Sequence, residues 1–175
     1  MFIRVKNIKG IQYAYLVKSV WEEKTVRQKV VHYLGKVYIL NKSNMVSFDE
    51  FCKGEKRTLQ NAEVKTIIQA LMEWTLVQHG FTKDSLLQKK WLFENGKAGG
   101  DPENLKITSG KKEITLKVNE GYMNSFTLKE LLKIQVSKKT EEQRRAATLL
   151  AKAFVNAGIQ IPQDMFIEVF QKVYQ

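Results

Sequence analysis

Basic residues are interleaved with tyrosines over the first 36 residues, and this is the strongest chemical signal in the sequence. Tyrosine rings can stack on nucleobases, and Arg and Lys can neutralise phosphates. The side chains of these two kinds are Arg4, Lys6, Tyr13, Tyr15, Arg27, Lys29, Tyr33 and Lys36. The pattern predicts a surface that contacts the phosphates and stacks on the bases of a nucleic acid.

Residues suited to catalysis are few. His32 and His79 are the only histidines, and neither has metal-ligand spacing to the other or to Cys52, the single cysteine. The sequence has no phosphate-cradling glycine-rich loop ending in Lys-Ser or Lys-Thr, and no dinucleotide fingerprint. We therefore expect a non-enzymatic protein with no catalytic residue, no metal and no cofactor.

The net charge points to a polyanionic partner. Lys and Arg number 29 and Asp and Glu 18, which gives +11. Residues 1–42 hold nine of the bases and two of the acids, so a quarter of the chain carries +7. Such an excess attracts nucleic acid through its long-range field and through counterion release. The alternative is that these charges only solvate the surface.

Weaker basic candidates lie further along the chain. A helix over about 62–78 and a second over about 84–94 could form a helix-turn-helix that presents lysines to a phosphate backbone. The tip of a predicted hairpin carries two neighbouring lysines, and the start of a later helix carries two neighbouring arginines. These secondary candidates are Lys83, Lys89, Lys90, Lys111, Lys112, Arg144 and Arg145.

The elements that must position the principal set are β-strands. Residues 2–8, 11–21 and 25–34 are rich in Val, Ile and Tyr, as strands are. Lys9-Gly10 suits a two-residue hairpin loop, because Gly accepts the positive φ that such loops require. Residues 22–24 are expected to form a three-residue connection, and Gly35 is expected to end the third strand, with a short fourth strand over 37–40.

Strand alternation then sorts the side chains into two faces. With the loops placed in this way, Trp21 faces Thr25 and Tyr13 faces Tyr33. The buried face is expected to hold Ile3, Val5, Ala14, Leu16, Val20, Val26 and Val30. The outer face is expected to carry Arg4, Lys6, Arg27 and Lys29 around Tyr13, Tyr15 and Tyr33. Cross-strand packing of tyrosines on basic side chains is also an ordinary stabilising arrangement, so the pattern admits a purely structural interpretation.

The same segment resembles the N-terminal segment of DDE-type transposases. The similarity lies in the opening Met1–Lys6, in Tyr13–Val17, and in the stretch from Val26 to Lys36, where an Arg-Gln pair precedes Tyr-Leu-Gly at a fixed spacing. It covers about 36 of the 175 residues. The resemblance implies a β module that faces nucleic acid. It does not imply transposition, since the rest of the chain lacks the widely spaced acidic residues of the catalytic core.

The remainder of the chain is mainly helical in pattern. Ser47 with Glu50 predicts a capped short helix through Cys52, and Asn61 is the expected N-cap of the 62–78 helix. Residues 96–104 predict a linker, followed by a hairpin over 105–118 around Ser109-Gly110. Further helices are predicted from Thr127, over 141–157 and after Pro162.

These patterns predict an α+β fold. It comprises an N-terminal antiparallel β-meander or half-barrel packed with helices, then a mainly helical C-terminal part with one β-hairpin. The expected organisation is a basic β module over 1–42, a helical segment over 43–98, and a hairpin plus helical domain over 105–175. No stretch approaches 18 uncharged apolar residues, and charges interrupt the apolar start of the chain. We therefore expect a cytoplasmic protein without a membrane span or signal peptide.

The favoured function is non-catalytic binding of nucleic acid, with RNA preferred to DNA because a tyrosine-bearing sheet suits unstacked bases. One alternative is a protein-interaction adaptor that docks a partner through the C-terminal helices, with Phe166, Phe170 and Tyr174 exposed. Another is a transposase-related DNA-binding accessory, or an enzyme acting on nucleic acid.

Overall fold

The computed structural model describes residues 1–22, 25–84, 90–94, 96–133 and 140–174. The protein has an α+β fold with two five-stranded sheets and five helices in this part of the chain. No helix among the described residues is both long and apolar enough to cross a membrane. The expected fold class is confirmed in outline, while the number and the pairing of the strands differ from the prediction.

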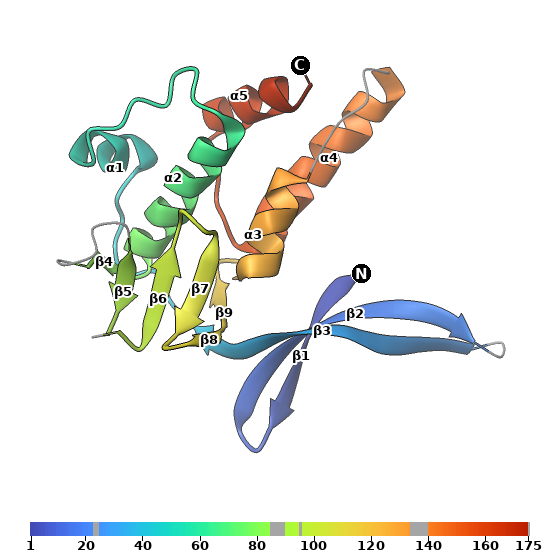
Figure 1. Cartoon of the computed structure of the whole chain (residues 1–175). Coiled ribbons are helices and arrows are strands. Elements are labelled where there is room, and N and C mark those ends of the chain that lie inside the picture. The colour runs from blue at the N-terminus through green and yellow to red at the C-terminus, as the bar shows by residue number, and fades with distance from the viewer. Residues whose placement is uncertain (23–24, 85–89, 95, 134–139, 175) are drawn as a thin grey trace.

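The first sheet is mixed and curls into a half-barrel (Figure 1). Its strands, in spatial order, are β1 (Phe2–Ile8), β2 (Ile11–Glu22), β3 (Thr25–Ile39), β9 (Thr115–Val118) and β10 (Gly121–Met123). The pairs along the N-terminal meander are antiparallel, but β3 and β9 run parallel. The first 40 residues therefore share a sheet with strands that follow 75 residues later in the sequence.

The first hairpin forms as predicted. Ile8 pairs with Ile11, and the two loop residues, Lys9 and Gly10, both have positive φ. This conformation is typical of the two-residue turns that match the twist of a hairpin. The Asn7 side chain accepts a hydrogen bond from the Gly10 amide, at 2.9 Å, and braces the turn.

The second hairpin has a different register from the predicted one. Glu22 pairs with Thr25, so two residues rather than three connect the strands, and Val20 pairs with Arg27 instead of Val26. Two bulges in β3 then insert Val31 and Leu34 opposite β2. Because each extra residue reverses the side to which later side chains point, the loop and the bulges together decide which residues share a face.

β3 does not end at Gly35, as had been expected, but changes partner there. Gly35 pairs with Ala14 of β2, and two residues later Val37 pairs with Thr115 of β9. Gly35 has φ +92°, and a Cβ at this position would lie 2.3 Å from the Glu113 carbonyl oxygen. Only glycine accommodates both the backbone conformation and this close approach. The residue thus lets one strand link the meander to the rest of the fold.

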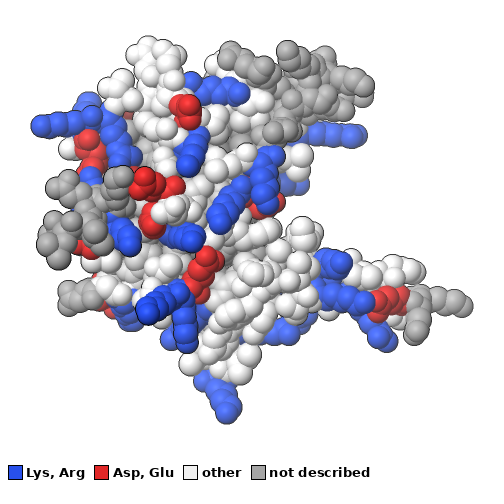
Figure 2. Space-filling view, in the orientation of Figure 1, with Lys and Arg blue, Asp and Glu red and all other residues white. Residues whose placement is uncertain are grey.

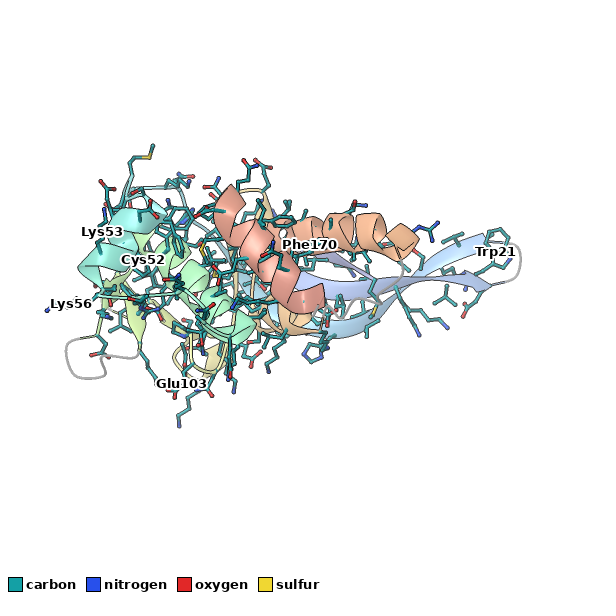
Figure 3. The ribbon with its side chains drawn as sticks, turned by 90° about the horizontal axis from the view of Figure 1, so that it is seen from above. Trp21, Cys52, Lys53, Lys56, Glu103 and Phe170 are labelled. Atoms are coloured by element: carbon teal, nitrogen blue, oxygen red, sulfur yellow. The ribbon has the colours of Figure 1, made fainter. Side chains whose placement is uncertain are left out.

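The far half of the β2–β3 hairpin projects from the rest of the molecule (Figure 1). Trp21 lies at its outer end, opposite the end of the molecule that carries Cys52 (Figure 3). Val26 and Val30, which were expected in the core, are therefore more than half exposed. This expectation was wrong because, among the described residues, no second layer buries these two side chains.

The second sheet is antiparallel and lies in the middle of the chain. Its strands are β4 (Thr82–Lys83), β5 (Trp91–Phe93), β6 (Ala98–Asp101), β7 (Lys106–Ser109) and β8 (Lys112–Glu113). The helix predicted over 84–94 is wrong where the structure describes it, since Trp91–Phe93 is a strand, and residues 85–89 lie outside the described residues. The predicted linker over 96–104 is also wrong in part, because Gly99 and Gly100 lie in β6, where a Cβ on Gly100 would lie 2.4 Å from a methyl carbon of the Leu76 side chain.

The predicted hairpin over 105–118 divides between the two sheets. β7 and β8 pair across Gly110, and Ile114 donates a backbone hydrogen bond to Ile107 at 3.1 Å. The chain then crosses to β9, which pairs with β3 and with β10. The 43–98 segment is consequently not purely helical, and the C-terminal part contains a second hairpin, formed by β9 and β10.

Five helices occur among the described residues. They are α1 (Phe48–Gly54), α2 (Val64–Gln78), α3 (Ser125–Leu132), α4 (Thr140–Ala157) and α5 (Gln163–Tyr174). The capping box of Ser47 and Glu50 at α1 is confirmed. Asn61 does not cap α2, whose N-cap is Glu63, and α3 begins earlier than Thr127, at a cap formed by Asn124.

One large hydrophobic core joins the helices to both sheets. Ile67, Ile68, Leu71, Ile107, Leu116, Leu128, Phe154 and Val169 are among its buried members. Phe166 and Phe170 are partly buried against it and stack on each other, with ring centroids 6.2 Å apart. These two side chains are therefore largely engaged within the fold, and the Tyr174 side chain lies outside the described residues. A smaller cluster of Ala14, Leu16, Leu34 and Val37 fills the half-barrel beneath β1–β3.

Candidate nucleic-acid interface

Three tyrosines form a cluster on one side of the meander, as predicted. The Tyr15 and Tyr33 ring centroids are 5.4 Å apart, and those of Tyr13 and Tyr33 are 6.3 Å apart, with the rings tilted. Tyr33 is 50% exposed, and the other two are partly exposed. The bulge at Val31 produces the cluster, because it places Tyr33 opposite Tyr15.

Three cations border this cluster. Arg4 of β1 pairs with Tyr15 of β2. Tyr13 of β2 pairs with Lys6 of β1 on one side and with Lys36 of β3 on the other. The Lys6 ammonium lies 5.3 Å from the centre of the Tyr15 ring, within cation–π range. Among the described residues, none of the three cations is paired with a carboxylate, while Arg4 donates a hydrogen bond to the neutral amide of Gln28. We call the six residues Arg4, Lys6, Tyr13, Tyr15, Tyr33 and Lys36 the tyrosine face.

Arg27 and Lys29 do not belong to the tyrosine face, and their predicted placement was wrong. Arg27 pairs with Val20 and Lys29 with Lys18, and these positions of β2 alternate to the side opposite Tyr15. The shorter loop is the cause, since a slip of one residue moves a whole strand segment to the other side. Lys29 instead forms an ion pair with Glu22 at the outer end of the hairpin.

Burial and neighbouring phenols raise the pKa of Tyr33 above its ordinary value. Loss of solvent around the ring is the larger cause, and the proximity of Tyr13 and Tyr15 adds to it. A raised phenol pKa keeps the hydroxyl neutral at physiological pH. Tyr33 therefore presents an uncharged ring beside the three cations.

A groove of about 540 Å³ extends from the tyrosine face to the second sheet. Its floor is β3 and its other wall is the β7–β8 hairpin. The residues that line it are Tyr13, His32, Tyr33, Gly35, Lys36, Tyr38, Ser109, Lys112, Glu113 and Ile114. The groove thus combines three tyrosines with lysines from two segments that lie more than 70 residues apart in the sequence.

Sequence reasoning missed Tyr38 and Ser109 as parts of this site. Tyr38 follows Lys36 by two residues in β3, and the Lys36 ammonium lies 5.1 Å from its ring centre. Strand alternation groups Tyr38 with Lys36 when the strand continues past Gly35, but the predicted strand ended there. No local pattern could have identified Ser109, because it reaches the groove only through the tertiary contact between the two sheets.

The secondary basic candidates lie at separate places. Lys83 forms an ion pair with Glu55 and lies 5.4 Å from the centre of the Trp91 ring. Lys90 is exposed, and Lys89 lies outside the described residues. The predicted helix-turn-helix is wrong, because the segment expected to form its turn and second helix contains the strands β4 and β5 where the structure describes it.

The other secondary candidates also lie at separate places. Lys111 and Lys112 are exposed at the β7–β8 turn, and Lys112 lines the groove. Arg145 is exposed on α4, whereas the Arg144 side chain lies outside the described residues. On the face shown in Figure 2, Lys and Arg are spread over the body and the projecting strands, and acidic side chains on those strands occur only near the far end. Among the described members of the secondary set, Lys112 is the one that lines the groove beside the tyrosine face.

The candidate reactive residues are dispersed. His79 is buried, its Nδ1 lies 2.7 Å from the Thr75 carbonyl oxygen, and burial lowers its pKa. Burial raises the pKa of the Cys52 thiol, which disfavours the nucleophilic thiolate. No group of three or more His, Cys, Asp or Glu side chains suited to a metal ion occurs within the described ranges. His32 is exposed and lines the groove.

No family model, curated protein or solved structure matches this chain.

Proposed function

We propose that this protein binds nucleic acid, RNA in preference to DNA, through the tyrosine face, without catalysing a reaction. The observation that carries the proposal is the exposed tyrosine cluster bordered by Arg4, Lys6 and Lys36, three cations without a carboxylate partner among the described residues. Cations left unpaired beside flat rings are suited to a ligand that offers phosphates and aromatic bases together.

The energetic argument has two parts. Each phosphate contact releases condensed counterions, which favours binding at low salt. Each base that stacks on an aromatic side chain contributes about 1–3 kcal/mol. RNA is preferred because single-stranded RNA presents splayed bases to sheet surfaces of this kind, whereas a duplex keeps its bases stacked inside.

The first test is the salt dependence of binding. A fluorescently labelled single-stranded RNA of mixed sequence should bind at low salt and lose affinity steeply as salt rises, with a log–log slope of about −0.7 for each phosphate neutralised on a single strand. A DNA of the same sequence should bind more weakly at each salt concentration. Absence of salt-dependent binding to either nucleic acid would refute the proposal.

A matched pair of double variants then tests the tyrosine face. Arg4→Ala with Lys6→Ala removes one Arg and one Lys from the tyrosine face, and Arg27→Ala with Lys29→Ala removes the same charges from the opposite side of the meander. The first should reduce affinity by about tenfold and lower the salt slope, because it removes two phosphate contacts. The second should change affinity by less than threefold. Equal losses would mean that binding follows net charge and not this face.

A further inference from the structure

We infer that the groove between β3 and the β7–β8 hairpin holds one unstacked nucleotide of a single-stranded nucleic acid. In this arrangement the base lies against the tyrosines and the phosphate lies between Lys36 and Lys112. The inference rests on the proposed function and extends it from a flat face to a defined subsite. It also names the form of the ligand, a single strand rather than a duplex.

The shape of the groove is the first argument. Its volume of about 540 Å³ lies within the range of roughly 300–1,000 Å³ that is typical of small-molecule sites, and it offers room for one nucleotide. Tyr13 and Tyr33 approach it from one end and Tyr38 from the β9 side. A base can reach such rings only after it leaves its stack, which costs little in a single strand and requires unpairing in a duplex.

The distribution of charge is the second argument. Lys36 of β3 lies 5.1 Å from the Tyr38 ring centre, and Lys112 of β8 lines the same groove, paired across its own hairpin with Ser109, which also lines it. Neither lysine forms an ion pair within the part of the chain that the structure describes. Glu113 lines the groove as well, so the lining residues include two lysines and one carboxylate.

The position of the groove is the third argument. It is continuous with the tyrosine face through Tyr13, Tyr33 and Lys36, so a strand that crosses the face can enter it without a break. Gly35 shapes its floor, because a side chain there would collide with the β8 backbone. The meander alone provides the tyrosine face, and the contact between the two sheets adds a subsite at one end of it.

The decisive experiment compares three probes with the same number of phosphates: a single-stranded 12-mer RNA, the same strand with abasic sites replacing the central bases, and a blunt hairpin duplex. The intact single strand should bind at least tenfold more tightly than either of the others at moderate salt. If the abasic strand or the duplex binds equally well with a steep salt dependence, the inference is wrong and the stacking part of the proposed function fails with it, while salt-dependent binding of nucleic acid through the cations of the tyrosine face stands. If no probe shows salt-dependent binding, both fail.

A matched pair of single variants locates the subsite. Lys112→Ala and Lys111→Ala each remove one exposed lysine from the same hairpin tip, but only Lys112 lines the groove. Lys112→Ala should weaken binding of the single strand about fivefold, and Lys111→Ala should weaken it less than twofold. A 2-aminopurine base in the strand should lose fluorescence on binding through stacking. Equal effects of the two variants, or unchanged fluorescence at every position of the strand, would overturn the assignment.

Discussion

The inner and outer halves of the β2–β3 hairpin are built from similar residues but have different surroundings. At the inner half, Ala14, Leu16 and Leu34 are buried beneath the sheet, and the tyrosines lie on the other side. At the outer half, Trp21 and Val30 are 73% and 53% exposed. The comparison shows that alternation along a strand decides only which side chains share a side. Whether that side is buried depends on what packs against it.

The largest expected effect lies at the point where the inner half joins the fold. Gly35→Val would place a side chain against the backbone of Glu113 and Ile114 at positive φ, and we expect it to cost about 3–5 kcal/mol of unfolding free energy. Urea denaturation followed by circular dichroism measures this cost. Gly10→Ala is the control, because Gly10 also has positive φ but nothing lies within 4 Å of an added Cβ, so it should cost only about 1–2 kcal/mol.

The next effect contrasts burial in the two halves directly. Leu16→Ala removes a side chain that is 3% exposed and should cost about 2–4 kcal/mol, through lost transfer energy and a residual cavity. Val30→Ala, in the outer half, should change the unfolding free energy by less than about 0.5–1 kcal/mol, the scale of strand propensity. Denaturant midpoints of the two purified variants measure the difference. Equal costs would show that the outer half is covered in solution.

The third prediction concerns function and uses one aromatic residue from each half. Tyr33→Ala should weaken single-stranded RNA binding by an amount equivalent to about 1–3 kcal/mol, or about 5- to 150-fold. Trp21→Ala removes a larger and more exposed ring from the outer end and should change affinity by less than twofold. Fluorescence anisotropy titrations at fixed salt give both values. A larger loss from Trp21→Ala would move the binding site to the outer half.

The smallest expected effect is electrostatic. Glu22→Gln breaks the ion pair with Lys29 at the outer end of the hairpin, where both side chains are partly exposed to solvent. Exposed pairs of this kind contribute about 0–1 kcal/mol, so we expect a change below about 0.5 kcal/mol in unfolding free energy that vanishes at high salt. Thermal melts at two salt concentrations test it. A larger change that persists at high salt would mean that the pair organises the outer half.

Much of the local structure could be predicted from sequence. Lys9-Gly10 predicts its turn because Gly10 accepts the positive φ that a two-residue hairpin loop requires, and Ser47 with Glu50 predicts a helix start because each side chain satisfies a backbone group. The α4 helix over Thr140–Ala157 followed from its apolar spacing. Gly99 and Gly100 of β6 were misassigned to a linker, because the close approach of Gly100 to the Leu76 side chain of α2 is a tertiary contact that local sequence does not reveal.

The candidate site was predicted in part. The shared side of Arg4, Lys6, Tyr13 and Tyr15 follows from the first hairpin and from alternation. The side on which Arg27 and Lys29 lie depended on one residue in the second loop, and the place of Tyr33 and Lys36 beside the other tyrosines depended on the two bulges in β3 as well. Neither the loop length nor the bulges leave a distinctive pattern in the sequence.

The sequence by itself determined the excess of positive charge near the amino end, the alternation of tyrosines with cations and the capped start of α1, because these depend on neighbours within a few residues. The tertiary structure alone decided that β3 passes from β2 to β9, that Lys112 reaches the tyrosines and that the outer hairpin stays uncovered. Those outcomes depend on contacts between segments tens of residues apart, and their energies come from packing rather than from local preference.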